Sequence, residues 1–223
     1  MQLEDSVKFA DNAEPRCPCV LLLDTSSSMS GDRINELNKG LQMFKDSLIQ
    51  DPTASKRVEV AIVTFSSSVS VVQNFVTANQ FQPPTLSASG STHMGSGIQE
   101  ALTLAAAEKA KYKEAGIAYY RPWVFMITDG KPEGESESVV QQAAQRVKEE
   151  DSEARKAVAF FAVGVAGADM ERLKEICVRS PVKLDGLNFG QMFLWLSASM
   201  QRVSQSNPGE QVGLPALGWG TVS

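Results

Sequence analysis

The chain has few of the residues that build disulfide frameworks or histidine-rich metal sites. Only three cysteines and one histidine, His93, occur among its 223 residues. An odd cysteine count does not fit a disulfide framework, and the neighbouring Cys17 and Cys19 alone would supply at most half of a zinc site. We therefore expect a reduced protein in which these two cysteines are buried where a strand begins.

The sequence also lacks a long hydrophobic run and a basic stripe. No apolar segment reaches the roughly 18 residues that indicate a membrane span, and the first 16 residues are polar and mixed in charge, unlike a signal peptide. The net charge of −5 argues against nucleic acid as a partner. These absences predict a cytoplasmic protein that binds neither membranes nor nucleic acid.

Two common enzyme motifs are missing as well. No glycine-rich phosphate loop follows the first apolar segment, which argues against a nucleotide-binding P-loop. No G-x-S-x-G sequence is present, which argues against the nucleophile elbow of an α/β-hydrolase. We expect a protein that is not an enzyme.

Apolar runs alternate with amphipathic segments along most of the chain. The apolar runs predict strands at Val20–Leu23, Val58–Phe65, Val69–Phe75, Trp123–Thr128, Val158–Val165 and Pro181–Leu184, the last at a sheet edge. Helical spacing predicts helices at about Asp32–Ile49, Gly95–Lys111, Ser136–Glu150, Met170–Cys177 and Phe189–Val203.

This order of elements indicates an α/β fold. Strands that are apolar throughout and alternate with helices form a doubly wound, mostly parallel central sheet with helices on both faces. The short Ser66–Ser68 link predicts one antiparallel strand, formed by Val69–Phe75. We expect a polar lead at residues 1–16, one domain at 17–206, and a tail at 207–223 that either docks or is flexible.

Oxygen-bearing side chains follow three of the predicted structural elements. Asp24, Ser26 and Ser28 come directly after the first strand, Thr92 lies in a glycine-flanked loop, and Asp129 ends a later strand. In a doubly wound sheet, ligands bind beyond the carboxyl ends of the strands. Carboxylates and hydroxyls are oxygen ligands suited to a hard divalent cation. The five residues therefore predict a metal site.

This D-x-S-x-S, T, D pattern resembles the metal-ion-dependent adhesion site (MIDAS) of von Willebrand factor A (VWA) domains. The resemblance extends over roughly Cys17–Val203, so that the VWA domain would occupy residues 17–206. The chain is similar in particular to the bacterial tellurium-resistance Y-type (TerY-like) proteins, through the segments Leu21–Ser26, Asn38–Met43, Phe81–Pro84, Arg121–Phe125 and Trp195–Ser199.

The resemblance implies a cytoplasmic module for protein–protein interaction in stress, tellurite-resistance or phage responses. Its partners would include kinase-like or phosphatase-like proteins. Mg²⁺, with Mn²⁺ or Ca²⁺ as alternatives, would be held directly or through water by Asp24, Ser26, Ser28, Thr92 and Asp129. A partner protein's Asp or Glu would then complete the metal's ligand shell.

Other functions fit parts of the same pattern. The runner-up is an adaptor subunit of an AAA-type ATPase or chelatase complex. A hydrolase would use Ser26 or Ser28 as nucleophile with His93 as base. A phosphatase of the dehalogenase type would need a second Asp two residues after Asp24, where this chain has Ser26.

Nearby acidic residues have simpler interpretations. We expect Asp32 to be the N-cap of the helix that follows the first loop, with support of the metal ligands as the alternative. The acidic side chains after Asp129, which are Glu133, Glu135 and Glu137, are expected to form a solvated patch at a helix start. Trp123 and Trp195 are expected in the core.

Overall fold

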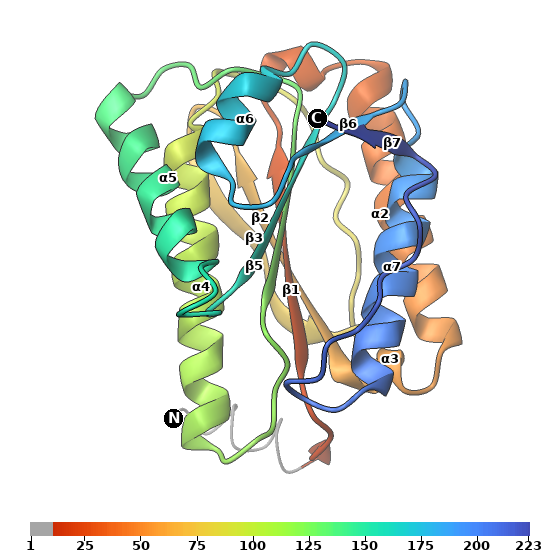
Figure 1. Cartoon of the computed structure of the whole chain (residues 1–223). Coiled ribbons are helices and arrows are strands. Elements are labelled where there is room, and N and C mark those ends of the chain that lie inside the picture. Colours follow the sequence, from red (N-terminus) through yellow and green to blue (C-terminus); the bar gives the residue numbers. More distant parts are fainter. Residues whose placement is uncertain (1–10) are drawn as a thin grey trace.

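The computed structural model describes residues 11–223, and its central feature is a seven-stranded sheet. The sheet runs through the middle of the molecule, with helices on both sides (Figure 1). Its strands are β1 (Cys17–Asp24), β2 (Val58–Phe65), β3 (Val69–Thr77), β4 (Trp123–Thr128), β5 (Ala159–Gly164), β6 (Val182–Leu184) and β7 (Gly220–Val222).

The strand order is β3-β2-β1-β4-β5-β6-β7, and the five inner strands are parallel. The predicted α/β class and the antiparallel β3 are confirmed. The edge assignment of Pro181–Leu184 is wrong, because β7 from the tail pairs antiparallel with β6 and forms the edge itself. The three-residue β7 lies too far from the other strands in sequence for a hairpin signal.

Helices cover the two faces of the sheet. They are α2 (Asp32–Gln50), α3 (Ala54–Arg57), α4 (Met94–Glu114), α5 (Glu137–Glu150), α6 (Met170–Ile176) and α7 (Phe189–Gln205), with a 3-10 turn η1 (Ser27–Met29). α2 and α7 pack on one face, while α4, α5 and α6 pack on the other (Figure 1). Within residues 11–223, none of these helices has the length and apolar character that a membrane crossing requires.

The apolar sequence of β1 explains its central place. All eight of its residues are buried, as expected for a strand covered by helices on both faces. From β1 the chain builds outwards through β2 to β3 and then returns to β4 on the other side of β1. This reversal of strand order leaves a crevice beyond the ends of β1 and β4, which is where ligands bind in such sheets. Asp24 and Asp129 lie at these two strand ends.

Glycines allow α4 to approach its neighbours closely. A Cβ atom on Gly97 would lie 2.9 Å from the Phe65 Cβ at the end of β2, and one on Gly95 would lie 2.9 Å from the Val140 Cα on α5. Any side chain at these positions would force the helix outwards. The glycines therefore fix the first turn of α4, and with it the loop that carries Thr92.

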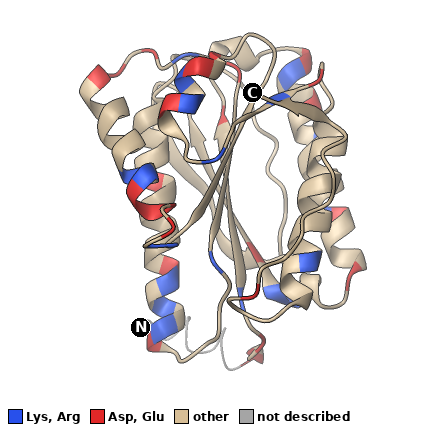
Figure 2. Ribbon diagram, viewed as in Figure 1, with Lys and Arg blue, Asp and Glu red and all other residues tan. Residues whose placement is uncertain are grey.

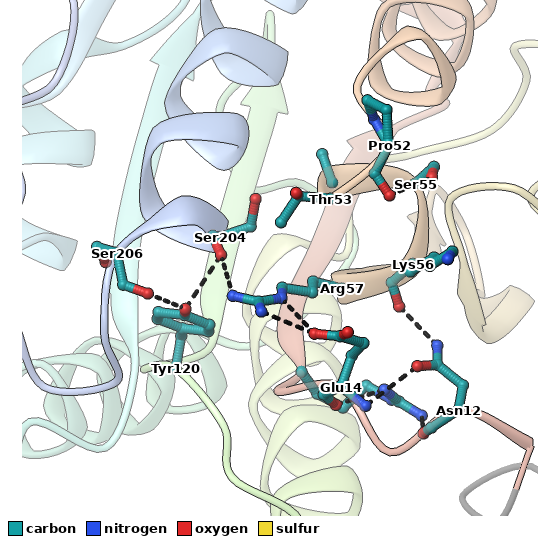
Figure 3. Close-up of polar contacts among 12 residues, drawn as sticks. Asn12, Glu14, Pro52, Thr53, Ser55, Lys56, Arg57, Tyr120, Ser204 and Ser206 are labelled. Carbon is teal, nitrogen blue, oxygen red and sulfur yellow. Dashed lines mark hydrogen bonds and ion pairs between the residues drawn. The ribbon is translucent and has the colours of Figure 1, made fainter.

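Polar contacts connect several elements at the end of the sheet opposite Asp24 and Asp129. Arg57 donates to the Glu14 carboxylate at 2.8 Å and to the Ser204 carbonyl at 2.8 Å, and the Tyr120 hydroxyl donates to the Ser206 carbonyl at 2.5 Å (Figure 3). These bonds join the segment before β1, the ends of α3 and α7, and the segment before β4. Beside them, Arg16 is fully buried and forms an ion pair with the buried Glu59 at 3.3 Å.

The tail packs on the α2–α7 side of the molecule. Trp219 is buried and its ring packs against Trp195 at 5.6 Å between centroids. The Trp195 indole donates to the Pro215 carbonyl at 2.9 Å. These contacts hold part of the tail against α7. Trp123 is buried as expected, whereas Trp195 is only partly buried and packs against the core cluster.

Candidate functional site

Asp24 is held in place from both of its carboxylate oxygens. Its Oδ1 accepts from the Ser26 backbone amide at 2.8 Å, and its Oδ2 accepts from the Thr128 hydroxyl at 2.6 Å. Asp24 is fully buried, so these bonds replace the water that the carboxylate loses on folding. Thr128 was not singled out by the sequence analysis. The feature that could have pointed to Thr128 is its position in the sequence, one residue before Asp129 and at the end of a predicted buried strand.

The first loop connects to the end of β4 through a chain of hydroxyls. The Ser26 and Ser28 hydroxyl oxygens lie 3.0 Å apart, and the Ser28 hydroxyl donates to Asp129 Oδ1 at 2.6 Å. Ser26 and Asp129 are buried, whereas Ser28 is exposed. The cluster therefore opens to solvent at Ser28.

Thr92 lies beside the same cluster. A Cβ atom placed on Gly130 would lie 3.5 Å from Thr92 Oγ1 and 3.8 Å from Asp24 Oδ2, so both oxygens flank this glycine. Thr92 is buried. Two backbone hydrogen bonds hold it against Glu133, one from the Thr92 amide at 3.0 Å and one from the Glu133 amide at 2.9 Å. The structure thus brings all five predicted residues to one edge of the sheet.

Arg33, in the first turn of α2, places a guanidinium at this cluster. Its Nη1 forms an ion pair with Asp129 Oδ2 and donates to the Ser28 carbonyl at 2.9 Å. Its Nη2 donates to the Ala166 carbonyl at 2.9 Å. Arg33 was missed by the sequence analysis, although its position five residues after Ser28 was visible. The side chain joins the loops that follow β1 and β5.

The electrostatics of the cluster favour a bound cation. Burial raises the pKa of Asp24, the hydrogen bonds from Ser26 and Thr128 lower it, and the nearby negative charge of Asp129 raises it. Two carboxylates with little access to water gain stability from a positive charge between or beside them. Arg33 already supplies one such charge to Asp129.

The donor atoms fit a hard divalent cation. Two carboxylates and three hydroxyls offer oxygen ligands only, which is the set that Mg²⁺ and Ca²⁺ prefer. Among residues 11–223, no group of three or more His, Cys, Asp or Glu side chains is suited to hold a metal. Hydroxyls would therefore supply part of the ligand set, and the ion would keep more of its positive charge than in an all-carboxylate site.

The acidic residues around the cluster have other contacts. Asp32 is the first residue of α2 and Gly31 is its N-cap, with φ of 76° and no side-chain cap bond, so the N-cap assignment of Asp32 is wrong. The Glu135 carboxylate accepts from the Gly95 and Ser96 amides at 2.5 and 3.1 Å and so caps α4. Glu137 pairs with Arg172 at 2.5 Å. Glu135 and Glu137 are therefore engaged in helix capping and an ion pair.

The His93 ring lies beside Gly134 and Ser91. Its Nε2 lies 2.9 Å from the position of a Cβ on Gly134, next to the Ser91 hydroxyl. Within the described part of the chain, the Ser26 hydroxyl bonds to that of Ser28, the Ser28 hydroxyl bonds to Asp129, and neither bonds to His93. The nucleophile–base contact that a serine hydrolase requires is not formed.

Comparison with known proteins matches this fold to one family. The family model for the von Willebrand factor type A domain matches residues 19–189. Von Willebrand factor type A from Catenulispora acidiphila superposes with a TM-score of 0.64 at 17% identity, over 85% of this chain and 43% of that chain. The pilus adhesin SpaC from Lactobacillus rhamnosus GG superposes with a TM-score of 0.65 at 15% identity, over 86% of this chain and 32% of that chain.

An archaeal structure is also similar. The ArnB paralog VWA2 from Sulfolobus acidocaldarius superposes with a TM-score of 0.53 at 15% identity, over 83% of this chain and 45% of that chain. The chain thus spans less than half the length of each of these structures, and at such identities the similarity shows the fold alone. No curated protein sequence matches the chain.

Proposed function

The chain belongs to the von Willebrand factor type A domain family, and we propose that it is a protein-binding module that acts through a divalent cation. Asp24, Ser26, Ser28, Thr92 and Asp129 would hold the ion, directly or through water, and Mg²⁺ is the expected ion, with Mn²⁺ or Ca²⁺ as alternatives. An Asp or Glu of a partner protein would supply a further ligand.

One observation carries this proposal. Oxygen atoms from three separate loops, which follow β1, precede α4 and follow β4, converge on one sheet edge that opens to solvent at Ser28. Hydrogen bonds fix the buried carboxylates before any ligand arrives, which reduces the ordering cost of binding.

The residues around the proposed metal site have separate roles. Thr128 and the Ser26 amide fix the orientation of Asp24, and Ser28 donates to Asp129 Oδ1. Arg33 forms an ion pair with the other Asp129 oxygen, which a bound cation would compete for. A bound divalent cation would act as a Lewis acid that attracts a carboxylate from outside. The exposed Ser28 marks the side from which a partner's carboxylate would approach.

The biological setting that we propose rests on the segments shared with the tellurium-resistance Y-type proteins. In that setting the protein acts in the cytoplasm of a bacterial cell during stress, tellurite or phage exposure. Its partners are kinase-like or phosphatase-like proteins. No catalytic step is assigned to the chain, because the Ser26 and Ser28 hydroxyls make no bond to His93, the base that a serine hydrolase would use here.

The proposal is tested by capturing partners from a bacterial lysate with the purified chain in Mg²⁺ and then in EDTA. A specific partner should bind in Mg²⁺, elute in EDTA and fail to bind Asp24→Asn, which keeps the size of the side chain. Asp32→Asn is the matched control, because Asp32 is exposed and makes no cap bond. Equal capture by Asp24→Asn and the parent protein, with or without EDTA, would disprove a metal-bridged contact.

A further inference from the structure

A second concave site lies far from the proposed metal site, at the opposite end of the sheet. It is a cavity of about 770 Å³ between the end of α4, the starts of β4 and β5, and the tail. Six basic side chains line it, which are Lys109, Lys113, Arg121, Arg155, Lys156 and Arg179. Only two acidic residues, Glu153 and Glu210, share this lining. We call it the basic cavity.

This concentration of positive charge contrasts with the rest of the molecule. The whole chain carries a net charge of −5, yet the cavity lining carries six positive and two negative side chains. Figure 2 shows several Lys and Arg segments on the lower turns of α4 and in the loop after α5. Like charges brought together repel one another, so the arrangement costs stability unless an anion offsets it.

Ion pairs within the chain neutralise only part of this charge. Lys156 pairs with Glu153 at 3.0 Å, and Arg121 and Arg179 share Asp151 at 2.6 and 3.1 Å. Within the described residues, Lys113 and Arg155 form no ion pair with a carboxylate, and both side chains are exposed. These two cations are available to a ligand.

The basic side chains are close enough to affect one another. The pKa of Lys109 is lowered, first by burial and then by the charge of Lys113; Glu150 opposes this shift, and Arg155 and Arg121 add to it. The Lys109 ammonium contacts the Ala157 carbonyl at 3.3 Å, which leaves its other donors free for a ligand. Burial likewise lowers the pKa of Arg121. Partial removal from water strengthens the attraction of such groups for an anion.

Aromatic rings form another wall of the cavity. Trp123 and Phe161 pack at 4.5 Å between centroids, and the Arg179 guanidinium lies 5.2 Å above the Phe161 ring. Tyr119 also lines the cavity and is partly exposed. A volume of this size suits a small ligand, and rings beside cations suit a ligand with an anionic and a planar part.

We propose that the basic cavity binds a small polyphosphate anion, with Lys113 and Arg155 as its principal contacts and Lys109 beside them. Inorganic tripolyphosphate and the triphosphate of a nucleotide share this chemistry. The binding is independent of the metal site and of its proposed function.

Calorimetric titration of the 223-residue chain tests this proposal with two probes, sodium tripolyphosphate and ATP, in EDTA so that no divalent cation takes part. The expected result is saturable binding at one site per chain. Charge-assisted hydrogen bonds are strong enough that Lys113→Ala and Arg155→Ala should each weaken binding by about tenfold. Lys39→Ala, an exposed lysine on α2, is the matched control and should leave binding unchanged.

The two probes separate the sources of the phosphate groups. Tighter binding of ATP than of tripolyphosphate would indicate that the aromatic wall contacts a base, whereas equal binding would indicate that the phosphates alone are recognised. Circular dichroism would confirm that the variants fold. Absence of saturation, or equal binding by the parent protein, Lys113→Ala and Arg155→Ala, would overturn the proposal.

Discussion

The Arg33 guanidinium forms an ion pair with Asp129, one of the two carboxylates at the proposed metal site. The Asp129 side chain is fully buried and the Arg33 side chain is about one third exposed. Arg33 therefore neutralises a carboxylate that would otherwise be available to a divalent cation. In this arrangement, a charge from the protein itself competes for part of the site.

Replacing Arg33 with Ala should raise the affinity for Mg²⁺ and Mn²⁺ by roughly tenfold, because a hydrogen-bonded charge of this kind contributes about 1.5–3 kcal/mol. Isothermal titration calorimetry measures the change. Arg33→Lys keeps the positive charge and should stay close to the parent affinity. An affinity that falls in Arg33→Ala would show that Arg33 supports the site rather than competing for it.

The crowding of basic groups around Lys109 has a measurable consequence. Removing one neighbouring charge with Lys113→Ala should raise the pKa of Lys109 towards 10.5, although burial, its first cause of depression, remains. Titration of the Lys109 side-chain resonances by nuclear magnetic resonance measures this. An unchanged pKa would show that the two lysines do not interact.

The lowered pKa of Lys109 also determines how the free energy of unfolding changes with pH. A lysine whose pKa is lowered by folding loses its proton at a lower pH in the folded state than in the unfolded state. Its contribution to the free energy of unfolding therefore rises as the pH increases from the lowered pKa to 10.5. The rise should be smaller in Lys113→Ala, as measured by urea unfolding across this pH range.

The three cysteines should be unreactive in the folded protein. Burial raises the pKa of Cys17 and of Cys177 to about 12, and it raises that of Cys19 as well. Few thiolates form at neutral pH, and thiolates are the reactive species. Ellman's reagent should titrate three thiols in guanidinium chloride and almost none in native buffer. Rapid reaction of two or more thiols in the native protein would show that β1, which carries Cys17 and Cys19, is not buried as described.

The docked tail should contribute to stability mainly through Trp219. Trp219→Ala removes a buried ring and should lower the free energy of unfolding by about 3–5 kcal/mol. Leu217→Ala is the matched control, since Leu217 is 36% exposed and surface substitutions usually change stability by about 0.5 kcal/mol or less. Urea unfolding measures both variants. Equal stability of the two would show that the tail does not pack on the body in solution.

The sequence predicted the fold well where periodicity was strong. β1 and β4 are apolar throughout and end in Asp24 and Thr128-Asp129, so their burial and their shared sheet edge followed from pattern alone. The three-residue β7 was not foreseen, because its pairing with β6 depends on where the tail folds back. The edge assignment of the 181–184 segment failed for that reason.

The polar environment of the site was harder to predict. The five oxygen-bearing residues were visible as a motif, but the Thr128 hydroxyl bond to Asp24 and the Arg33 contact to Asp129 depend on side-chain directions. Asp32 was expected as the N-cap, yet Gly31 takes that position with a positive φ. The basic cavity could not be recognised in the sequence, because its six basic residues are spread from residue 109 to residue 179.

Titration with Mn²⁺, followed by electron paramagnetic resonance, shows whether the side chains at the ends of β1 and β4 bind a divalent cation. The parent protein and the Asp32→Asn control should each bind one Mn²⁺ ion, which Mg²⁺ displaces. Asp24→Asn and Asp129→Asn should lose this binding while retaining the circular dichroism of the folded chain. No Mn²⁺ binding by the parent protein, or unchanged binding by both site variants, would show that these side chains do not form a metal site.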